Sequence, residues 1–404
     1  MRPSSGFGLV EIMVAIVISL LASLAIYHTF STSEGFRRST LGNGNAQSSG
    51  GIAIMQIQKD LERSGYGIGS SRALNCNVVS QNANYTNFPL VPVRITTVAG
   101  GSDQISLMYS TSPAGGMPAL FGEGTTHTNN DNQFVNILLA SQFQTGDLVV
   151  VWPDPGKQAQ TACPLFQITC TSADCVGAGT PAAGKDFLLR HTANALWNDT
   201  ALNRPFPAAL PMNTTRLFNF GTMIRRTYCV YLAASPKLKR NPNECSMADN
   251  KTDGSLISMD VPKDKVIDAS SWTSTTENVV QLKAEYGFDT NKDGDNIPNN
   301  VSADGWSKTT PNTLLGWQQL VAIRYAVLVR SNYPEKPDRA GNCNATTNTA
   351  ELKWAGGAFN PPPLTAQPSG TSWQCYRYSV HETVVPLRNQ RLINQPNLIS
   401  TAAP

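Results

Sequence analysis

The sequence has little charge and few of the residues that usually perform catalysis. Asp, Glu, Lys and Arg make up 15% of the 404 residues, the net charge is +3, and only four histidines occur. No run of five like charges is present, so electrostatics gives no support for nucleic-acid binding. The motifs His-Glu-x-x-His and Gly-x-Ser-x-Gly are both missing. We therefore expect a protein without enzyme activity and without a required cofactor.

Proline is missing from the first part of the chain, where none occurs between Pro3 and Pro89. Within this stretch, residues 12–33 carry no charged side chain. Such a run is long enough to cross a hydrocarbon core of about 30 Å as a helix that rises about 1.5 Å per residue. The absence of proline allows that helix to continue well beyond the apolar run.

The continuation of this segment is amphipathic. Ile54, Ile57 and Leu61 form an apolar stripe at helical spacing among polar neighbours. We predict one helix of about 55 residues, apolar over 7–33 and amphipathic over 34–63, with the second half packed on a globular domain. Several glycines between 42 and 51 weaken it by up to about 1 kcal/mol each, which predicts local melting there.

One carboxylate, Glu11, lies at the start of the apolar run, after a short leader from Met1 to Gly6. An acidic group inside a membrane costs up to about 2.5–3.5 kcal/mol, so Glu11 needs a partner. An ordinary signal is cut after its apolar segment, whereas a cut at Gly6 would leave the helix on the mature protein. The alternative is an uncleaved signal anchor that tolerates Glu11.

Gly6, Phe7 and Glu11 resemble the class III signal of type IV prepilins and type II secretion pseudopilins. The resemblance implies that a prepilin peptidase cuts between Gly6 and Phe7 and N-methylates the new amine of Phe7. It also implies that Glu11 pairs with the terminal amine of a neighbouring subunit during fibre assembly and helps to set the register. Such a pairing is physically reasonable, because each charge alone is costly in a helix bundle.

The cysteine pattern indicates disulfides in an oxidising compartment. The count is even, it follows an export segment, and no Cys-x-x-Cys suggests zinc. Proximity favours Cys229 with Cys245 and Cys343 with Cys375. The other four cysteines would share two further bonds, and these four are Cys76, Cys163, Cys170 and Cys175.

The rest of the chain, from about 64 to 391, has the pattern of a β-rich domain with a short tail at 392–404. Glycines after Ser64 end the helix, and strand signals recur near 105–109, 148–152, 224–232, 280–286 and 320–329. The alternation in VVQLKAEYG predicts that Gln281, Lys283 and Glu285 face water. Segments 111–145, 153–215 and 333–372 are long, poor in periodicity and predicted to be insertions on a smaller sheet.

An acidic loop follows the strand near 280–286. Asp289, Asn291 and Asp293 occupy positions 1, 3 and 5 of an EF-hand-like pattern, with Gly294 at position 6 and Asp295 behind it. The twelfth position is Asn300 and not Glu, so a complete EF-hand is not expected. Two interpretations remain open, a stand-alone Ca²⁺ loop and a solvated acidic turn.

The acidic loop, the LVAIRYAVLVRS strand and the alternating stretch 376–389 together resemble the PilW family of minor type IV pilins. The resemblance implies an α+β pilin-like fold, with a long N-terminal α-helix packed on an antiparallel β-sheet that carries large loop insertions. It implies a single-pass inner-membrane protein with a periplasmic domain, which enters the pilus fibre or its tip. Its expected role is to help initiate type IV pilus assembly within a minor-pilin priming or tip complex.

The expected partners are the prepilin peptidase, other minor pilins, the major pilin and a PilY-type tip adhesin. Two alternatives of different kinds remain. The first is a minor pseudopilin of type II secretion, which has a similar signal and fold. The second is a membrane-tethered adhesin or secreted enzyme, in which the helix serves only as an anchor.

Overall fold

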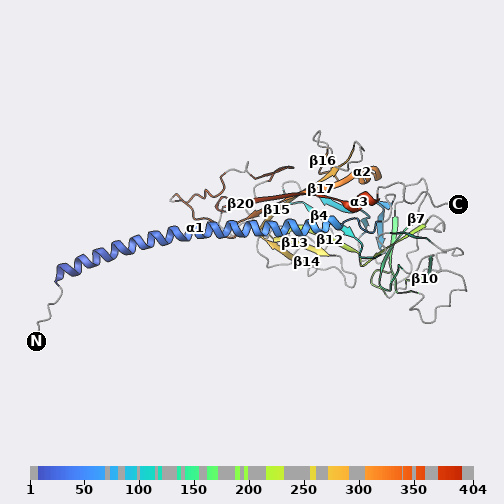
Figure 1. The fold of residues 1–404 in the computed structure, drawn as a ribbon, viewed down its shortest axis with the longest axis horizontal. Coiled ribbons are helices and arrows are strands. Elements are labelled where there is room, and N and C mark those ends of the chain that lie inside the picture. Colours follow the sequence, from blue (N-terminus) through green and yellow to red (C-terminus); the bar gives the residue numbers. More distant parts are fainter. Residues whose placement is uncertain are drawn as a thin grey trace, which may run out of the picture.

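The computed structural model describes most of the helix and of the strands that follow it. The described residues are 8–68, 73–80, 87–97, 101–113, 117–120, 134–137, 142–153, 162–171, 187–191, 195–198, 215–231, 255–260, 272–290, 305–338, 340–347, 352–359 and 372–393. Figure 1 shows a long helix that leaves a body of β-sheets at one end and runs along the sheets with its other half.

Helix α1 spans Leu9–Arg63, and its 55 residues confirm the predicted length. Its second half contacts three strands, and its buried residues recur at helical spacing. The strands are β20 (Tyr378–Pro386), β17 (Leu320–Arg330) and β14 (Trp272–Glu277). Ile57 and Leu61 are completely buried, as the predicted stripe requires. Burying each of these side chains contributes about 1.5–3 kcal/mol. The helix ends as expected, with Gly65 and Gly67 in the left-handed region at φ of 78° and 90°.

Two antiparallel sheets lie beside this half of the helix. The four-stranded sheet has the order β16-β15-β17-β20 and the five-stranded sheet has the order β14-β13-β12-β4-β3. Their bounds are β16 (Trp306–Ser307), β15 (Val279–Phe288), β17 (Leu320–Arg330), β20 (Tyr378–Pro386), β14 (Trp272–Glu277), β13 (Ser255–Asp260), β12 (Ile224–Tyr231), β4 (Gln104–Tyr109) and β3 (Val93–Thr96).

The predicted insertions before residue 215 contribute to two more sheets at the end of the body remote from the N-terminus (Figure 1). A six-stranded sheet has the order β2-β1-β8-β7-β11-β5 and includes one parallel pair, β1 with β8; a three-stranded sheet has the order β6-β10-β9. Their bounds are β2 (Phe88–Pro89), β1 (Asn77–Ser80), β8 (Ala162–Gln167), β7 (Leu148–Pro153), β11 (Thr215–Gly221), β5 (Ala119–Leu120), β6 (Phe134–Ile137), β10 (Phe187–Arg190) and β9 (Cys170–Thr171).

Short elements complete the described fold: the hairpin β18 (Lys353–Trp354) and β19 (Gly357–Ala358), helix α2 (Leu314–Gln319), the 3₁₀ turn η5 (Trp373–Cys375) and helix α3 (Arg388–Ile393). The tail predicted from residue 392 thus begins inside α3. This helix fixes the end of α1, because the Asn389 amide donates to the carbonyl oxygens of Arg63 and Ser64, at 3.1 Å each. The C-terminal part of the chain therefore caps the helix that the N-terminal part forms.

The polar face of β15, formed by Gln281, Lys283 and Glu285, was predicted to face water, and this was wrong for two of the three residues. Gln281 and Glu285 are 1% and 5% exposed. The β18–β19 hairpin supplies part of the cover, since Trp354 packs in one cluster with Val280 of β15. Glu285 accepts a hydrogen bond from Nε of Arg324 at 2.7 Å. A buried carboxylate is tolerated here because a largely covered guanidinium pairs with it.

Candidate functional site: the N-terminal helix

The first half of α1 is exposed along its whole length. Every residue from Gly8 to Ser33 is exposed, and large apolar side chains such as Leu24 (70%) and Phe30 (70%) point away from the helix on several sides. Its most apolar 18-residue window has a mean hydropathy of 2.7, and no residue of that window is buried. Within the described chain, α1 is the only helix whose length and composition suit a membrane span. A helix that is apolar all round requires lipid or other helices as surroundings.

Glu11 lies in the first turn of this exposed half. The backbone N–H of Gly8 donates to Oε2 of Glu11 at 3.0 Å, so the carboxylate lies at the positive end of the helix dipole. A carboxylate can accept several hydrogen bonds, and this bond therefore leaves capacity for an additional amine donor. Gly6 and Phe7 lie outside the described residues, so cleavage and methylation there stay predictions.

The second half of α1 approaches the sheet closely through small residues. Gly42, Ala46, Gly50 and Ala53 follow one another on the buried face. A Cβ added at Gly50 would lie 2.1 Å from Cδ2 of His381, which is far closer than any real contact. The helix is continuous through all these glycines, contrary to the predicted local melting. The intrinsic cost of glycine is offset because its missing side chain lets the backbone pack on the sheet.

A buried acid, Asp60, fastens the same helix face to the five-stranded sheet. Asp60 is 4% exposed and accepts from Nη1 of Arg226 at 2.7 Å. The hydroxyls of Tyr228 and Tyr109 also donate to it, at 2.5 and 3.3 Å. Burial, and then the hydrogen bond to Asp60, raise the pKa of the Tyr228 hydroxyl, which therefore stays protonated as a donor. This network fixes the rotation of α1 about its own axis and its position along the sheet.

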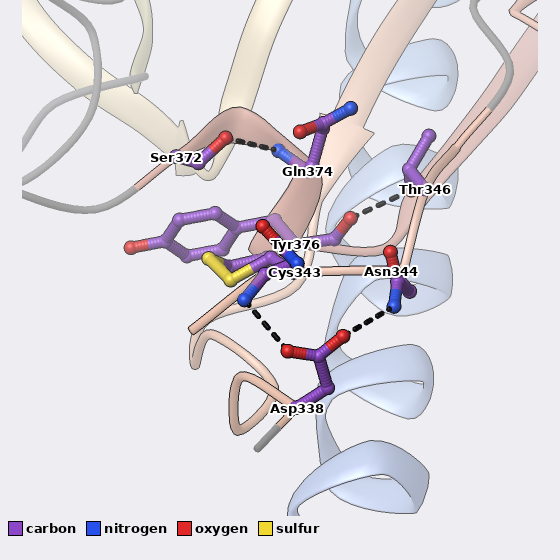
Figure 2. The surroundings of a disulfide bond; sticks show 9 residues. Asp338, Cys343, Asn344, Thr346, Ser372, Gln374 and Tyr376 are labelled. Carbon is purple, nitrogen blue, oxygen red and sulfur yellow. Dashed lines mark hydrogen bonds between the residues drawn. A yellow bond between two sulfur atoms is a disulfide. The ribbon is translucent and has the colours of Figure 1, made fainter. Parts of the chain in front are cut away.

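Two disulfides hold the loops beside this framework. Cys343 bonds to Cys375, as proximity predicted, and Cys76 bonds to Cys163. In Figure 2, Asp338 lies beside the Cys343–Cys375 bond and binds the chain around it. Its carboxylate accepts from the backbone N–H groups of Ala340 and Asn342 at 2.9 and 2.8 Å. These bonds lower the pKa of Asp338, with the Asn342 bond the largest cause.

The described residues include only some of the cysteines in the remaining disulfide predictions. Cys170 and Cys229 are also disulfide-bonded. Cys245, the predicted partner of Cys229, lies outside the described residues, and so does Cys175. The pairing of Cys229 with Cys245 therefore stays a prediction.

The Ca²⁺ interpretation receives no support from the described residues. Asp289 is 8% exposed, and its backbone N–H donates to the carbonyl oxygen of Gln319 at 2.9 Å. Asn291, Asp293, Asp295 and Asn300 lie outside the described part of the chain. Within that part, no three His, Cys, Asp or Glu side chains gather in a way that could hold a metal ion.

Sequence reasoning missed the Asp60 network, although a signal for it exists. Asp60 lies three residues after Ile57 and next to Leu61, so it shares the stripe that becomes buried. An acid on the apolar face of an amphipathic helix predicts a partner on the packed surface. The partner itself, Arg226, comes from a strand more than 160 positions later and has no local signal.

A long helix that is exposed and apolar in its first half and packed on antiparallel sheets in its second half defines a pilin-like protein. Residues 1–27 match the prokaryotic N-terminal methylation motif, and residues 235–389 match the family described as type IV pilus-assembly protein W, or PilW. These two matches support a PilW-family type IV pilin with a prepilin signal. No curated protein and no solved structure matches it significantly.

Proposed function

We propose that this pilin is a minor pilin that helps to initiate type IV pilus assembly within a priming or tip complex. The exposed first half of α1 carries the proposal, because none of the described residues covers its apolar surface. Lipid would cover it while the protein is anchored in the inner membrane. Helices of other pilins would cover it in the fibre. Motility, adhesion and DNA uptake are the activities that such a fibre serves.

One face of this segment suits close contact with another helix. Glu11, Ala15, Ser19 and Ser23 follow one another at intervals of four residues along one exposed face of α1. Small residues at this spacing allow helix backbones to approach closely in an apolar medium. Glu11 lies at the N-terminal end of this face, where the methylated amine of Phe7 from a neighbouring subunit would neutralise it. Pairing in this position would set the vertical register of the two subunits.

Transfer of the helix from lipid to the fibre gains little free energy from apolar burial alone, because both surroundings exclude water. The energy for extraction must then come from the assembly machinery. The packed second half of α1 would transmit that pull to the globular body through Asp60 and the small-residue contacts with β17 and β20. The prepilin peptidase, other minor pilins, the major pilin and a PilY-type adhesin remain the proposed partners.

Deletion of the gene tests this role against the pseudopilin alternative. Loss of surface pili and twitching, restored by the normal chain but not by a Glu11→Ala variant, supports assembly of a type IV pilus. Normal pili with lost export of secreted proteins would instead show a type II secretion pseudopilin. Normal pili with normal export would leave a tethered adhesin or enzyme and contradict the proposal.

A further inference from the structure

Strand β20 forms a long edge of the four-stranded sheet. It lies last in the order β16-β15-β17-β20 and pairs with β17 along its nine residues, Tyr378–Pro386. Among the described residues, no second strand pairs with β20 on its other side. An edge strand of this kind presents backbone N–H and C=O groups to which a strand of another chain can bind.

The register of β20 on β17 shows which of its backbone groups point to the outer edge. Just beyond the strand, the N–H of Leu387 donates to the carbonyl oxygen of Val321 at 2.8 Å. Hydrogen-bonded pairs alternate along an antiparallel ladder, and this register has no shift, so the odd-numbered residues of β20 bond to β17. The N–H and C=O groups of three even-numbered residues, Val380, Glu382 and Val384, therefore point to the outer edge.

Two other sheet edges are protected against such pairing. At the β3 edge of the five-stranded sheet, the N–H of Ile95 donates to the hydroxyl of Tyr286 at 2.5 Å. The carbonyl oxygen of Ile95 accepts from the hydroxyl of Thr310 at 3.1 Å. At the other end of the four-stranded sheet, β16 has only two residues, and short edge strands pair poorly. In β20, by contrast, a proline that lacks an N–H occurs only at the last position, Pro386.

The side chains along this edge indicate what a bound strand must contain. Val380, Glu382 and Val384 share the sheet face opposite to α1, because the ring of the neighbouring His381 lies against the helix. Val384 is 53% exposed. The Glu382 side chain is also exposed, and its Oε2 accepts from the N–H of Ala355 at 2.7 Å. A carboxylate accepts several hydrogen bonds, so Glu382 retains capacity for a cation.

We propose that the β20 edge binds an extended strand of another protein, antiparallel to β20, with a basic residue opposite Glu382 and an apolar residue opposite each valine. Opposite charges and apolar side chains both stabilise cross-strand pairs. A second copy of β20 centred on Glu382 would place two like charges opposite each other, which disfavours it as the partner. Strand binding of this kind does not depend on the function proposed above.

The binding test uses a synthetic strand as its probe, the fluorescently labelled peptide acetyl-TVTKTVT-amide. Its lysine would lie opposite Glu382 and its two valines opposite Val380 and Val384, whereas its threonines would face the side on which α1 lies. Fluorescence anisotropy measures binding of the peptide to the full chain in detergent micelles, with empty micelles as the blank. Saturable binding is expected, and its absence at millimolar peptide would overturn the proposal.

Two singly N-methylated peptides form a matched pair that tests the backbone hydrogen bonds. A methyl group on the backbone nitrogen of the lysine removes an N–H that bonds to β20, and should weaken binding about tenfold or more. A methyl group on the backbone nitrogen of the next threonine points away from β20 and should leave binding nearly unchanged. A peptide with glutamate in place of lysine should also bind more weakly, because it meets Glu382. Equal weakening by the two methyl groups would contradict strand pairing.

Variants of the chain test the same edge from the other side. Val384→Pro removes an outward N–H but no bond to β17, so the sheet should still fold, which its unfolding transition checks. This variant should bind the lysine peptide about tenfold more weakly or worse. Val384→Ile keeps the N–H and an apolar side chain, and should bind as the normal chain does. Glu382→Gln keeps an acceptor for Ala355 and should weaken binding of the lysine peptide but not of the glutamate peptide.

Two results with these variants would overturn the proposal. The first is equal peptide binding by Val384→Pro and Val384→Ile when both are folded. The second is a dimer of the normal chain that Val384→Pro dissociates, measured by analytical ultracentrifugation in the same micelles. A second copy, and not a basic strand of another protein, would then occupy the β20 edge.

Discussion

Two adjacent glycines in α1 offer a matched test of how the helix packs. Gly50 faces β20, and an added Cβ would lie 2.1–2.6 Å from three atoms of the His381 ring. Gly51 is exposed, and an added Cβ there meets no atom within 4 Å. Gly→Ala should bring the same intrinsic helix stabilisation, up to about 1 kcal/mol, at both positions. Only Gly50→Ala should add an overpacking cost of about 1–3 kcal/mol.

We therefore expect Gly51→Ala to raise the free energy of unfolding by up to about 1 kcal/mol. Gly50→Ala should lower it or leave it unchanged, so that the two variants differ by about 1–3 kcal/mol. Guanidinium unfolding of the full chain in detergent micelles measures this, with tryptophan fluorescence as the signal, because Trp317 lies buried in the same core as Ile57.

The same two substitutions in a His381→Ala chain test whether the His381 ring causes the difference between them. In His381→Ala, the space beside Gly50 is empty, and Gly50→Ala should then stabilise the chain about as much as Gly51→Ala does. If Gly50→Ala and Gly51→Ala stabilise the normal chain equally, the helix does not approach β20 as the structure shows. The account of the glycine contacts would then be refuted.

Three further predictions concern stability and metal binding. Asp60→Ala removes the buried acceptor of Arg226 and should lower the free energy of unfolding by about 3 kcal/mol in the same assay. A loss below about 1 kcal/mol, as expected for an exposed ion pair, would contradict the network. Replacing Cys343 and Cys375 by alanine opens a loop with a sequence separation of 32 and should lower the free energy of unfolding by up to about 3–4 kcal/mol. An unchanged free energy of unfolding would mean that the disulfide does not constrain the unfolded chain. If the acidic loop binds Ca²⁺, calorimetry should detect binding at millimolar Ca²⁺, and Asp293→Ala should abolish it. If no binding is detected and Asp293→Ala leaves the melting temperature unchanged, the Ca²⁺ interpretation is refuted.

The long helix could be predicted from the sequence because its signals are local. The uncharged run, the absence of proline and the spacing of Ile57 and Leu61 lie within the segment that they describe. The strands β15 and β17 were predictable for the same reason. Local patterns of this kind report the periodicity of a segment directly.

The errors arose where a distant segment decides the outcome. The polar side of β15 looked wet, but Trp354, almost 70 residues later, helps to cover it. Gly50 looked like a weak point of the helix, but His381 occupies the space beside it. Asp60 depends on Arg226, which comes from a strand more than 160 positions later. Propensity and alternation contain no information about such partners.

The central claim is that the apolar helix remains on a processed pilin. Intact-mass and N-terminal analysis of the membrane form, with and without the prepilin peptidase, tests it most directly. The account predicts a peptidase-dependent chain that begins at N-methylated Phe7. A chain that keeps Met1 to Gly6 in the presence of the peptidase would contradict it, because its amine could not reach the Glu11 of a neighbouring subunit in the proposed register.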